Sequence, residues 1–230
     1  LISLMYLVFI TMLALNVSKE VLDGFGQMYV KISEANTRVD ESNNNIYENI
    51  KTNAEDKGGK WVGHLRTAEE IKKESDEFYL KIGEIISQIT EKQREKDPEL
   101  KEYAQMDKGE ELDIMFFKEG SDDAAIDFLD MINNYKMHVI QVFGSQYPEY
   151  IEMVEARFFT GDENGNIQNR DGMDEQWFNA NFQGFPLVSS LAKFSMMQND
   201  IRQTEHDVFA TLMGKELKMS SNVNESNYIS

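Results

Sequence analysis

The sequence predicts a mainly α protein: a single N-terminal transmembrane helix, then an up-and-down bundle of about four helices with a small irregular or β-hairpin insertion. Three observations predict this class. The first eighteen residues carry no charge, apolar residues then recur mostly every three or four positions, and only three prolines interrupt 230 residues. Apolar residues at that spacing fall on one helix face, and proline disrupts helix interiors. We divide the chain into the transmembrane helix 1–18, a bundle domain 19–219 and a linker 220–230 to further domains outside this chain.

The uncharged segment 1–18 reads LISLMYLVFITMLALNVS and is long enough to cross a bilayer. Eighteen helical residues extend about 27 Å, close to the thickness of the hydrocarbon core. A cleaved signal peptide would need a basic start, a shorter apolar stretch and a small-x-small cleavage site, which Ala14-Leu15-Asn16 matches poorly. The pattern therefore favours a membrane anchor. Because the chain begins with Leu rather than Met, we expect residues upstream of it.

Polar side chains inside this segment are unusual because lipid disfavours them. The hydroxyls of Ser3 and Thr11 can bond back to their own helix. The hydroxyl of Tyr6 cannot reach its own backbone. Two interpretations of Tyr6 stay open: a tyrosine of the interfacial aromatic belt, or one that faces a protein partner or a proton path.

The first helix of the bundle is expected to continue directly from the anchor. Its apolar positions keep a spacing near three and four, and they are Val21, Leu22, Phe25, Met28, Ile32, Val39, Ile46 and Ile50. Gly24 and Gly26 weaken this helix by about 1 kcal/mol each, so we expect a hinge there. A turn at residues 53–59 (NAEDKGG) should end it.

The remaining helices follow from the same patterning. A second helix carries an apolar stripe from Ile71 to Ile89 and stops before Pro98, after which LDIMFF at 112–117 suggests a short strand or buried edge. A third helix starts at the cap residue Ser121 and ends at Gly144, with Ile126, Leu129, Ile132, Tyr135, Val139 and Phe143 as its stripe. Residues 157–185 form a loop or hairpin region turning at Asn164-Gly165. The last helix begins after Pro186, with Gln198 and Glu205 inside its apolar seam.

Composition and motifs exclude several functions. The net charge of −18 repels nucleic acid and anionic lipid, and the absence of cysteine excludes disulfides and thiolate metal sites. His64, His138 and His206 have no metal-ligand spacing, and the loop starting at Asp162 fails the EF-hand pattern. No nucleophile, phosphate-loop or dinucleotide motif occurs. We therefore expect neither an enzyme nor a cofactor or metal.

Two segments resemble a known family. The stretch LMYLVFITMLALNVSKEVL is similar to the membrane-anchor signature of the GldM/PorM family, and GFPLVSSLAKFSMMQNDIRQTEHDVFATL is similar to its last bundle helix. The resemblance implies an inner-membrane, single-pass protein whose bulk lies in the periplasm, in the type 9 secretion and gliding-motility machinery. It covers both ends of the chain well and the middle loosely.

The resemblance also implies partners and a mechanism. GldM-like proteins form a homodimer whose anchor helices sit inside a ring of GldL/PorL-like membrane subunits, and proton flow is thought to turn the dimer. Distal domains would then reach outer-membrane-associated secretion components. By this resemblance Tyr6 is the strongest candidate for a ring-facing or proton-path residue, with Ser3, Thr11 and Asn16 weaker. The family also has a basic residue just upstream of this motif, beyond Leu1.

An alternative from another class stays open at this stage. A membrane-anchored sensor could use the same helical bundle to bind a small ligand, and it would need a buried polar pocket. An exported enzyme with a signal anchor is disfavoured because no catalytic motif occurs.

Overall fold

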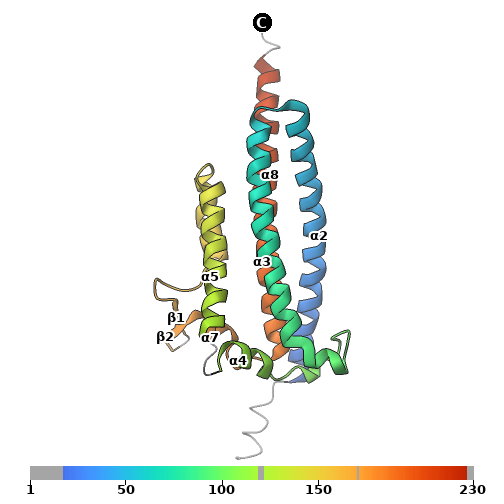
Figure 1. The fold of residues 1–230 in the computed structure, drawn as a ribbon, viewed down its shortest axis with the longest axis vertical. Coiled ribbons are helices and arrows are strands. Elements are labelled where there is room, and N and C mark those ends of the chain that lie inside the picture. The colour runs from blue at the N-terminus through green and yellow to red at the C-terminus, as the bar shows by residue number, and fades with distance from the viewer. Residues whose placement is uncertain (1–17, 119–121, 170, 227–230) are drawn as a thin grey trace, which may run out of the picture.

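The computed structural model describes residues 18–118, 122–169 and 171–226, and their side chains except at 122–123 and 215–226. Three long helices form the body of the molecule (Figure 1). They are α2 (Lys19–Lys57), α3 (Lys60–Lys96) and α8 (Leu187–Ser226). At 1.5 Å per residue, helices of this size extend roughly 55–60 Å. The mainly helical class predicted from the sequence is confirmed.

The direction of each long helix follows from the bonds between them. Hydrogen bonds from α2 to α8 join residues 159 to 163 positions apart, for example Asn36 with Ser195 and Asn43 with His206, so these two helices are parallel. From α8 to α3 the partners run in opposite order, since Gln198 bonds to Tyr79 and Arg202 to Asp76. The three long helices therefore alternate in direction, as an up-and-down bundle requires, but the first and last are parallel neighbours, whereas four successive helices would have left them antiparallel.

A shorter layer packs beside these helices and lies to the left in Figure 1. Its principal helix, α5 (Asp122–Val139), continues into a π-helical turn, η2 (Ile140–Gly144), and ends at Gly144 as the sequence predicted. The other short elements are η1 (Tyr103–Gln105), α4 (Glu110–Phe116), η3 (Pro148–Tyr150), α6 (Ile151–Arg157), β1 (Asn166–Gln168), β2 (Asp174–Gln176) and α7 (Trp177–Phe182). The layer leaves and rejoins the long helices at the same end, where α3 finishes and α8 begins (Figure 1), so α8 runs antiparallel to α3 and parallel to α2.

Apolar side chains on the facing sides of these elements form one core. Along the long helices it includes Leu22, Ile50, Ile71, Phe78, Ile82, Ile89, Leu191, Ile201, Val208, Phe209 and Leu212. An aromatic cluster joins the short elements to α8: the Phe178 ring centroid lies 5.1 Å from that of Phe116, and Phe182 stacks on Phe194 at 4.9 Å. Rings at these separations attract one another beyond simple burial.

Three local predictions are corrected. The LDIMFF segment is helical rather than a strand, because Leu112 and Phe116 lie one helical turn apart and are both buried in α4. In α5 the core position is Phe128, whereas Ile126 is 54% exposed. The hairpin exists, but Asn164-Gly165 precedes it: β1 pairs antiparallel with β2 from Asn166↔Gln176 to Gln168↔Asp174, so the chain turns after Gln168.

The start of α2 differs from the continuous helix expected there. Ser18 has extended backbone angles, φ −65° and ψ 148°, and its side chain accepts a hydrogen bond from the Val21 N–H. A serine in this geometry is an N-cap, which marks a helix start. Within the described ranges no helix is both long and apolar enough to span a membrane. The predicted anchor spans residues 1–18, and all of it except Ser18 lies outside those ranges.

The two predicted hinge glycines lie in different surroundings. Both are helical in α2, so the bending expected of them stays a prediction. Gly24 has no neighbour within 4 Å of where a Cβ would stand. A Cβ on Gly26 would lie 2.1 Å from Cγ of Tyr103, so the absence of a side chain lets η1 pack directly on α2.

The other predicted segments compare simply with the structure. The turn after the first helix is shorter than expected, because α2 runs to Lys57 and the positive φ angles of Gly58 (61°) and Gly59 (56°) reverse the chain. The last helix begins after Pro186 as predicted. It continues to Ser226, so residues 220–226, predicted as linker, are helical.

The two glycines give a matched test of this packing. We expect Gly24→Ala to raise the free energy of unfolding by up to about 1 kcal/mol, because alanine favours a helix and meets nothing there. Gly26→Ala should lower it by about 1–3 kcal/mol through the clash with Tyr103. Urea denaturation of both variants measures the difference. Equal stabilisation by both would show that η1 does not pack on Gly26.

Candidate functional site

A buried charged cluster joins the three long helices at mid-length. Its centre is the Arg202 guanidinium of α8, only 7% exposed. One nitrogen, Nη1, donates to Oδ1 of Asp76 on α3 at 2.7 Å, and Nη2 lies 3.1 Å from Oδ1 of Asp40 on α2. The same guanidinium lies 4.5 Å from the centroid of the Tyr79 ring. One side chain therefore contacts all three helices.

A carboxylate one turn along α8 completes the cluster. Glu205 is fully buried, and its Oε2 accepts from Arg202 Nη1 at 2.9 Å. From α2, the Asn43 amide donates to that oxygen at 3.2 Å and to the Arg202 backbone carbonyl at 2.9 Å. The Asn43 side-chain carbonyl lies 2.9 Å from Nδ1 of His206. Both ends of this asparagine are thus used to fix α2 against α8.

A second polar contact lies two helical turns toward the start of α8. Asn36 of α2 is buried and donates to the Ser195 carbonyl at 3.1 Å, while its own carbonyl accepts from Asn199 at 2.8 Å. Gln198 donates to the Tyr79 carbonyl of α3 at 3.2 Å. Together, Asn36, Asp40, Asn43, Asp76, Gln198, Arg202 and Glu205 form what we call the polar seam.

Burial sets the electrostatics of the polar seam. Burial raises the pKa of Glu205, and the Arg202 guanidinium opposes this rise without cancelling it. The other carboxylate oxygen of Glu205, Oε1, accepts no hydrogen bond from the described residues and lies 3.8 Å from Nζ of Lys72. Burial alone would lower the pKa of Arg202, but the carboxylates of Glu205, Asp76 and Asp40 together raise it. The arginine therefore stays charged.

This chemistry suits alignment rather than catalysis. The three carboxylates of the seam are ion-paired with Arg202, and Asp76 and Glu205 also with Lys72. No group of three or more His, Asp or Glu among the described residues could hold a metal ion. A buried polar contact is satisfied only when its partners are opposite one another, so it penalises any shift of one helix along another. The polar seam therefore fixes the register of α2 and α3 on α8.

A half-buried carboxylate, Asp200, lies on another face of α8. Burial raises the pKa of Asp200 to about 6, and Arg157 of α6 partly opposes the rise. Asp200 lines a cavity of about 170 Å³ with Phe158, Trp177 and Lys193 among its neighbours. Arg157 itself is engaged by Thr204 at 2.7 Å and Asp207 at 3.0 Å.

None of the predicted proton-path and hinge residues belongs to the polar seam. Ser3, Tyr6, Thr11 and Asn16 lie outside the described residues, and Gly24 and Gly26 lie near the start of α2. The sequence did place Gln198 and Glu205 in the apolar face of α8, and both are buried. It missed Arg202, Asn43 and Asn36. Asn36 and Asn43 are seven residues apart, a heptad spacing that could have indicated a polar contact within a helical seam.

Comparison with known proteins decides the family. The profile of the GldM N-terminal domain matches residues 20–215. The chain belongs to the GldM family. The matched range begins at Glu20, after the predicted transmembrane segment 1–18, so the assignment rests on the bundle itself and agrees with the resemblance seen in the sequence. Among curated proteins, none matches the chain.

Family membership places this GldM-family chain among the components of the gliding-motility and type 9 secretion machinery. The family is a structural or motor component of that machinery rather than a class of enzyme. The family is one of inner-membrane proteins with a periplasmic domain, and the range matched here is the family's N-terminal domain. The polar seam lies inside this domain.

Removing the central arginine should destabilise the bundle strongly. Arg202→Met removes the hydrogen-bonded counter-charge of the fully buried Glu205, which should lower the free energy of unfolding by about 3–5 kcal/mol. Arg202→Lys keeps the charge but not the fork of donors, so we expect a smaller loss. Lys31→Met, at an exposed pair with Glu34, is the control and should change stability by less than about 0.5 kcal/mol. Equal effects of Arg202→Met and Lys31→Met in urea denaturation would contradict the role of the seam.

Asp200 predicts a measurable pH dependence. Its pKa in the folded state is about 6, above the ordinary value of 3.8, so its ionisation opposes folding as pH rises. Asp200→Asn should therefore be more stable than the native chain at pH 7.5, by roughly 1 kcal/mol because the side chain is partly exposed. The difference should shrink between pH 6 and pH 4. A thermal-unfolding gap that stays constant across this range would contradict the assignment.

Proposed function

We propose that this chain is the anchor and first periplasmic segment of a rotor or shaft in an inner-membrane motor driven by the proton-motive force. The observation that carries the proposal is the family match over residues 20–215. Powering type 9 protein secretion and gliding motility would then require the domain to pass force from the membrane to distal domains. No enzymatic step is needed for this role.

The mechanical properties of the bundle support the proposal. Three helices of 37 to 40 residues lie side by side along one axis. The polar seam keeps them from sliding, because a shift would separate Arg202 from Asp40 and Asp76. A body of this kind resists shear between its helices, and it can transmit a push or torque applied at the start of α2.

A homodimer is supported by a partly exposed apolar row on α2. The core-facing positions of α2 include the polar residues of the seam. A second row, made of apolar residues at heptad spacing, runs beside them. That row consists of Val21, Phe25, Met28, Ile32, Ala35 and Val39, spaced 4, 3, 4, 3 and 4. Val21 is 48% and Met28 45% exposed, and the others are half-buried. Apolar a and d positions at this spacing are the seam of a coiled coil, so we infer that two copies pair through this row.

The membrane partners are part of the same proposal. The anchor helices of the dimer would sit in a ring of GldL/PorL-like subunits, with Tyr6 facing the ring and Ser3, Thr11 and Asn16 in weaker roles. A proton crossing 100 mV releases about 2.3 kcal/mol, which can drive motion only if the anchor binds two states of the ring differently. Distal domains would contact outer-membrane-associated components.

The sensor alternative finds little support in the cavities. That alternative needs a buried polar pocket, but the site beside Asp200 measures about 170 Å³, below the 300–1,000 Å³ of typical small-ligand sites, and the larger space of about 650 Å³ between α3 and α5 is an open surface groove. We therefore keep the motor role as the single proposed function.

The test is a secretion or gliding measurement with a matched pair of tyrosine changes. Tyr6→Phe removes only the hydroxyl in the predicted anchor. We expect it to slow secretion several-fold while the unfolding temperature of the bundle stays the same as in the native chain. Tyr29→Phe makes the same chemical change within α2 and should leave activity unchanged. Full activity of Tyr6→Phe would remove Tyr6 from the mechanism. Failure of the native chain to co-purify with a ring-forming membrane protein would contradict the motor itself.

A further inference from the structure

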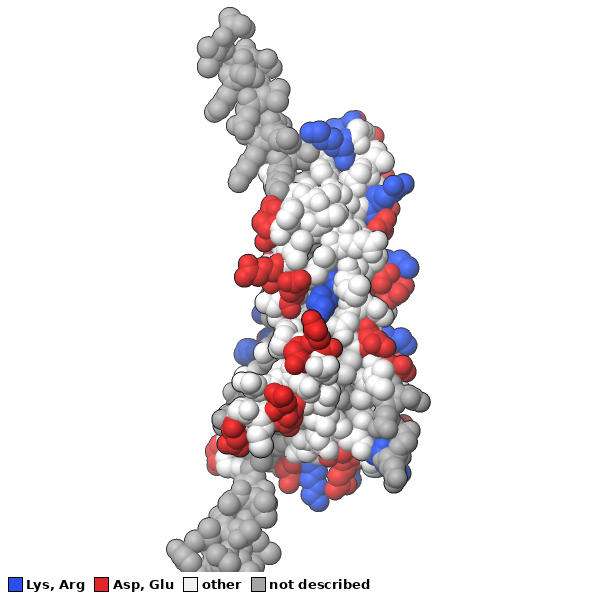
Figure 2. Space-filling view, turned by 90° about the vertical axis from the view of Figure 1, so that its left-hand side faces the viewer, with Lys and Arg blue, Asp and Glu red and all other residues white. Residues whose placement is uncertain are grey.

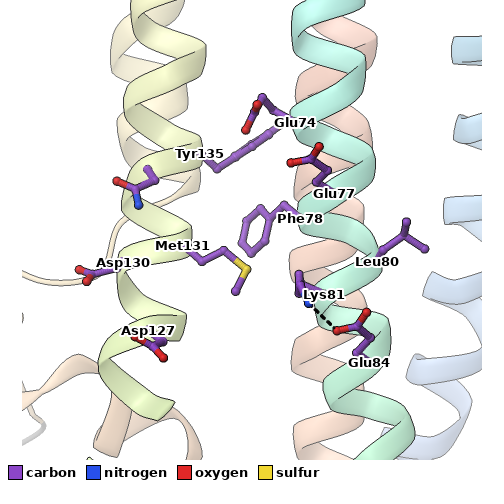
Figure 3. A pocket seen from close by; sticks show the side chains of 11 residues that line it. Glu74, Glu77, Phe78, Leu80, Lys81, Glu84, Asp127, Asp130, Met131 and Tyr135 are labelled. Atoms are coloured by element: carbon purple, nitrogen blue, oxygen red, sulfur yellow. Dashed lines mark hydrogen bonds and ion pairs between the residues drawn. The ribbon is translucent and has the colours of Figure 1, made fainter. Parts of the chain in front are cut away.

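A groove of about 650 Å³ lies between α3 and α5, away from the polar seam and from the α2 row. In Figure 3, Phe78 and Met131 point toward one another across it, and Tyr135 reaches from α5 toward α3 near Glu74. The hydroxyl of Tyr135 bonds to Ser75 at 2.9 Å, which closes the groove at that end. Toward Glu84 and Asp127 the two helices leave an open, partly apolar channel.

Acidic side chains line both banks of this groove. Five carboxylates and one lysine face it: Glu74, Glu77 and Glu84 with Lys81 on α3, and Asp127 and Asp130 on α5. Lys81 is already paired with Glu84 at 2.8 Å. No ion pair between described residues engages Asp127 or Asp130. The α5 side of the molecule carries acidic side chains across its face, with most basic ones at its edge (Figure 2).

The combination of an apolar floor and acidic banks selects one class of occupant. We propose that this groove binds a basic amphipathic helix of another protein. Helix-in-groove recognition places an apolar stripe of the incoming helix in a hydrophobic channel. Lysines or arginines flanking that stripe would meet the carboxylates on either side. The inference goes beyond the proposed motor role and does not depend on it.

Other occupants fit the groove less well. The described residues contain no group of three acids placed to hold a metal ion. A second copy of this chain carries a net charge of −18 and would be repelled by the acidic banks. Nucleic acid and anionic lipid are repelled for the same reason. A cationic helix is attracted by the net negative charge of the banks, where Glu74, Glu77 and Glu84 are already paired with Lys73 or Lys81 but Asp127 and Asp130 are in no ion pair between described residues.

The test uses a designed eighteen-residue peptide with Leu at i, i+3, i+4 and i+7 positions and Lys elsewhere. Its dissociation constant for the full chain in a nonionic detergent is measured by fluorescence anisotropy. The triple variant Glu77→Gln, Asp127→Asn, Asp130→Asn should bind about tenfold more weakly, since three charge contacts are lost. The control Glu41→Gln, Glu48→Gln, Glu55→Gln removes the same charge from exposed positions of α2 and should change binding less than about twofold.

Two further measurements make the result decisive. A scrambled peptide of the same composition should bind at least about tenfold more weakly, because it lacks the apolar stripe. Hydrogen exchange with the designed peptide should show added protection at residues 74–84 and 127–135. Equal loss of binding in both triple variants, equal binding of the scrambled peptide, or no binding at all would overturn the proposal. Altered self-association of the groove variant would assign the groove to a second copy and would also overturn it.

Discussion

The arrangement of the long helices depends on one buried guanidinium. Arg202 lies on α8, the helix that packs against both α2 and α3. It bonds to a carboxylate on each of them, Asp40 of α2 and Asp76 of α3. An apolar interface alone would tolerate a shift of one helical turn, since leucine and isoleucine repeat along every stripe. A guanidinium and its acceptors do not, because a misplaced charge would be buried without a partner. The apolar core supplies stability, whereas this cluster specifies which alignment is adopted.

Much of the helical framework could be predicted from the sequence because its signals are local. Gly58 lies at the end of α2 and Pro186 just before the start of α8, and the apolar stripe from Ile71 to Ile89 indicates which face of α3 is buried. The relative directions of α2 and α8 could not be predicted this way. They depend on the path of the chain between Gly144 and Pro186. The short helices of this region are held in place by the aromatic cluster, which the spacing of apolar residues along the sequence does not reveal.

Only part of the polar seam could be predicted from the sequence, for a similar reason. Glu205 stood out because it interrupts an apolar stripe, and its burial was expected from that position. Arg202 and Asn43 lie at positions that are equally typical of a solvent-facing side chain. Only the partner helix determines that they are buried, and that partner is about 160 residues distant. The row from Val21 to Val39 shows the converse: apolar positions assigned to the core remain partly exposed.

The parallel pairing of α2 and α8 also determines the order in which the helices can pack as the chain is synthesised. α2 is synthesised first, yet most of its polar partners belong to α8, 159 to 163 residues later. At 5–20 residues per second, α2 must wait roughly 10–30 s for them. Until then Asn36, Asp40 and Asn43 face water on a helix that has only α3 to pack against. Those polar side chains keep the waiting helix soluble, so the groups that define alignment in the finished domain also protect its first helix from premature association.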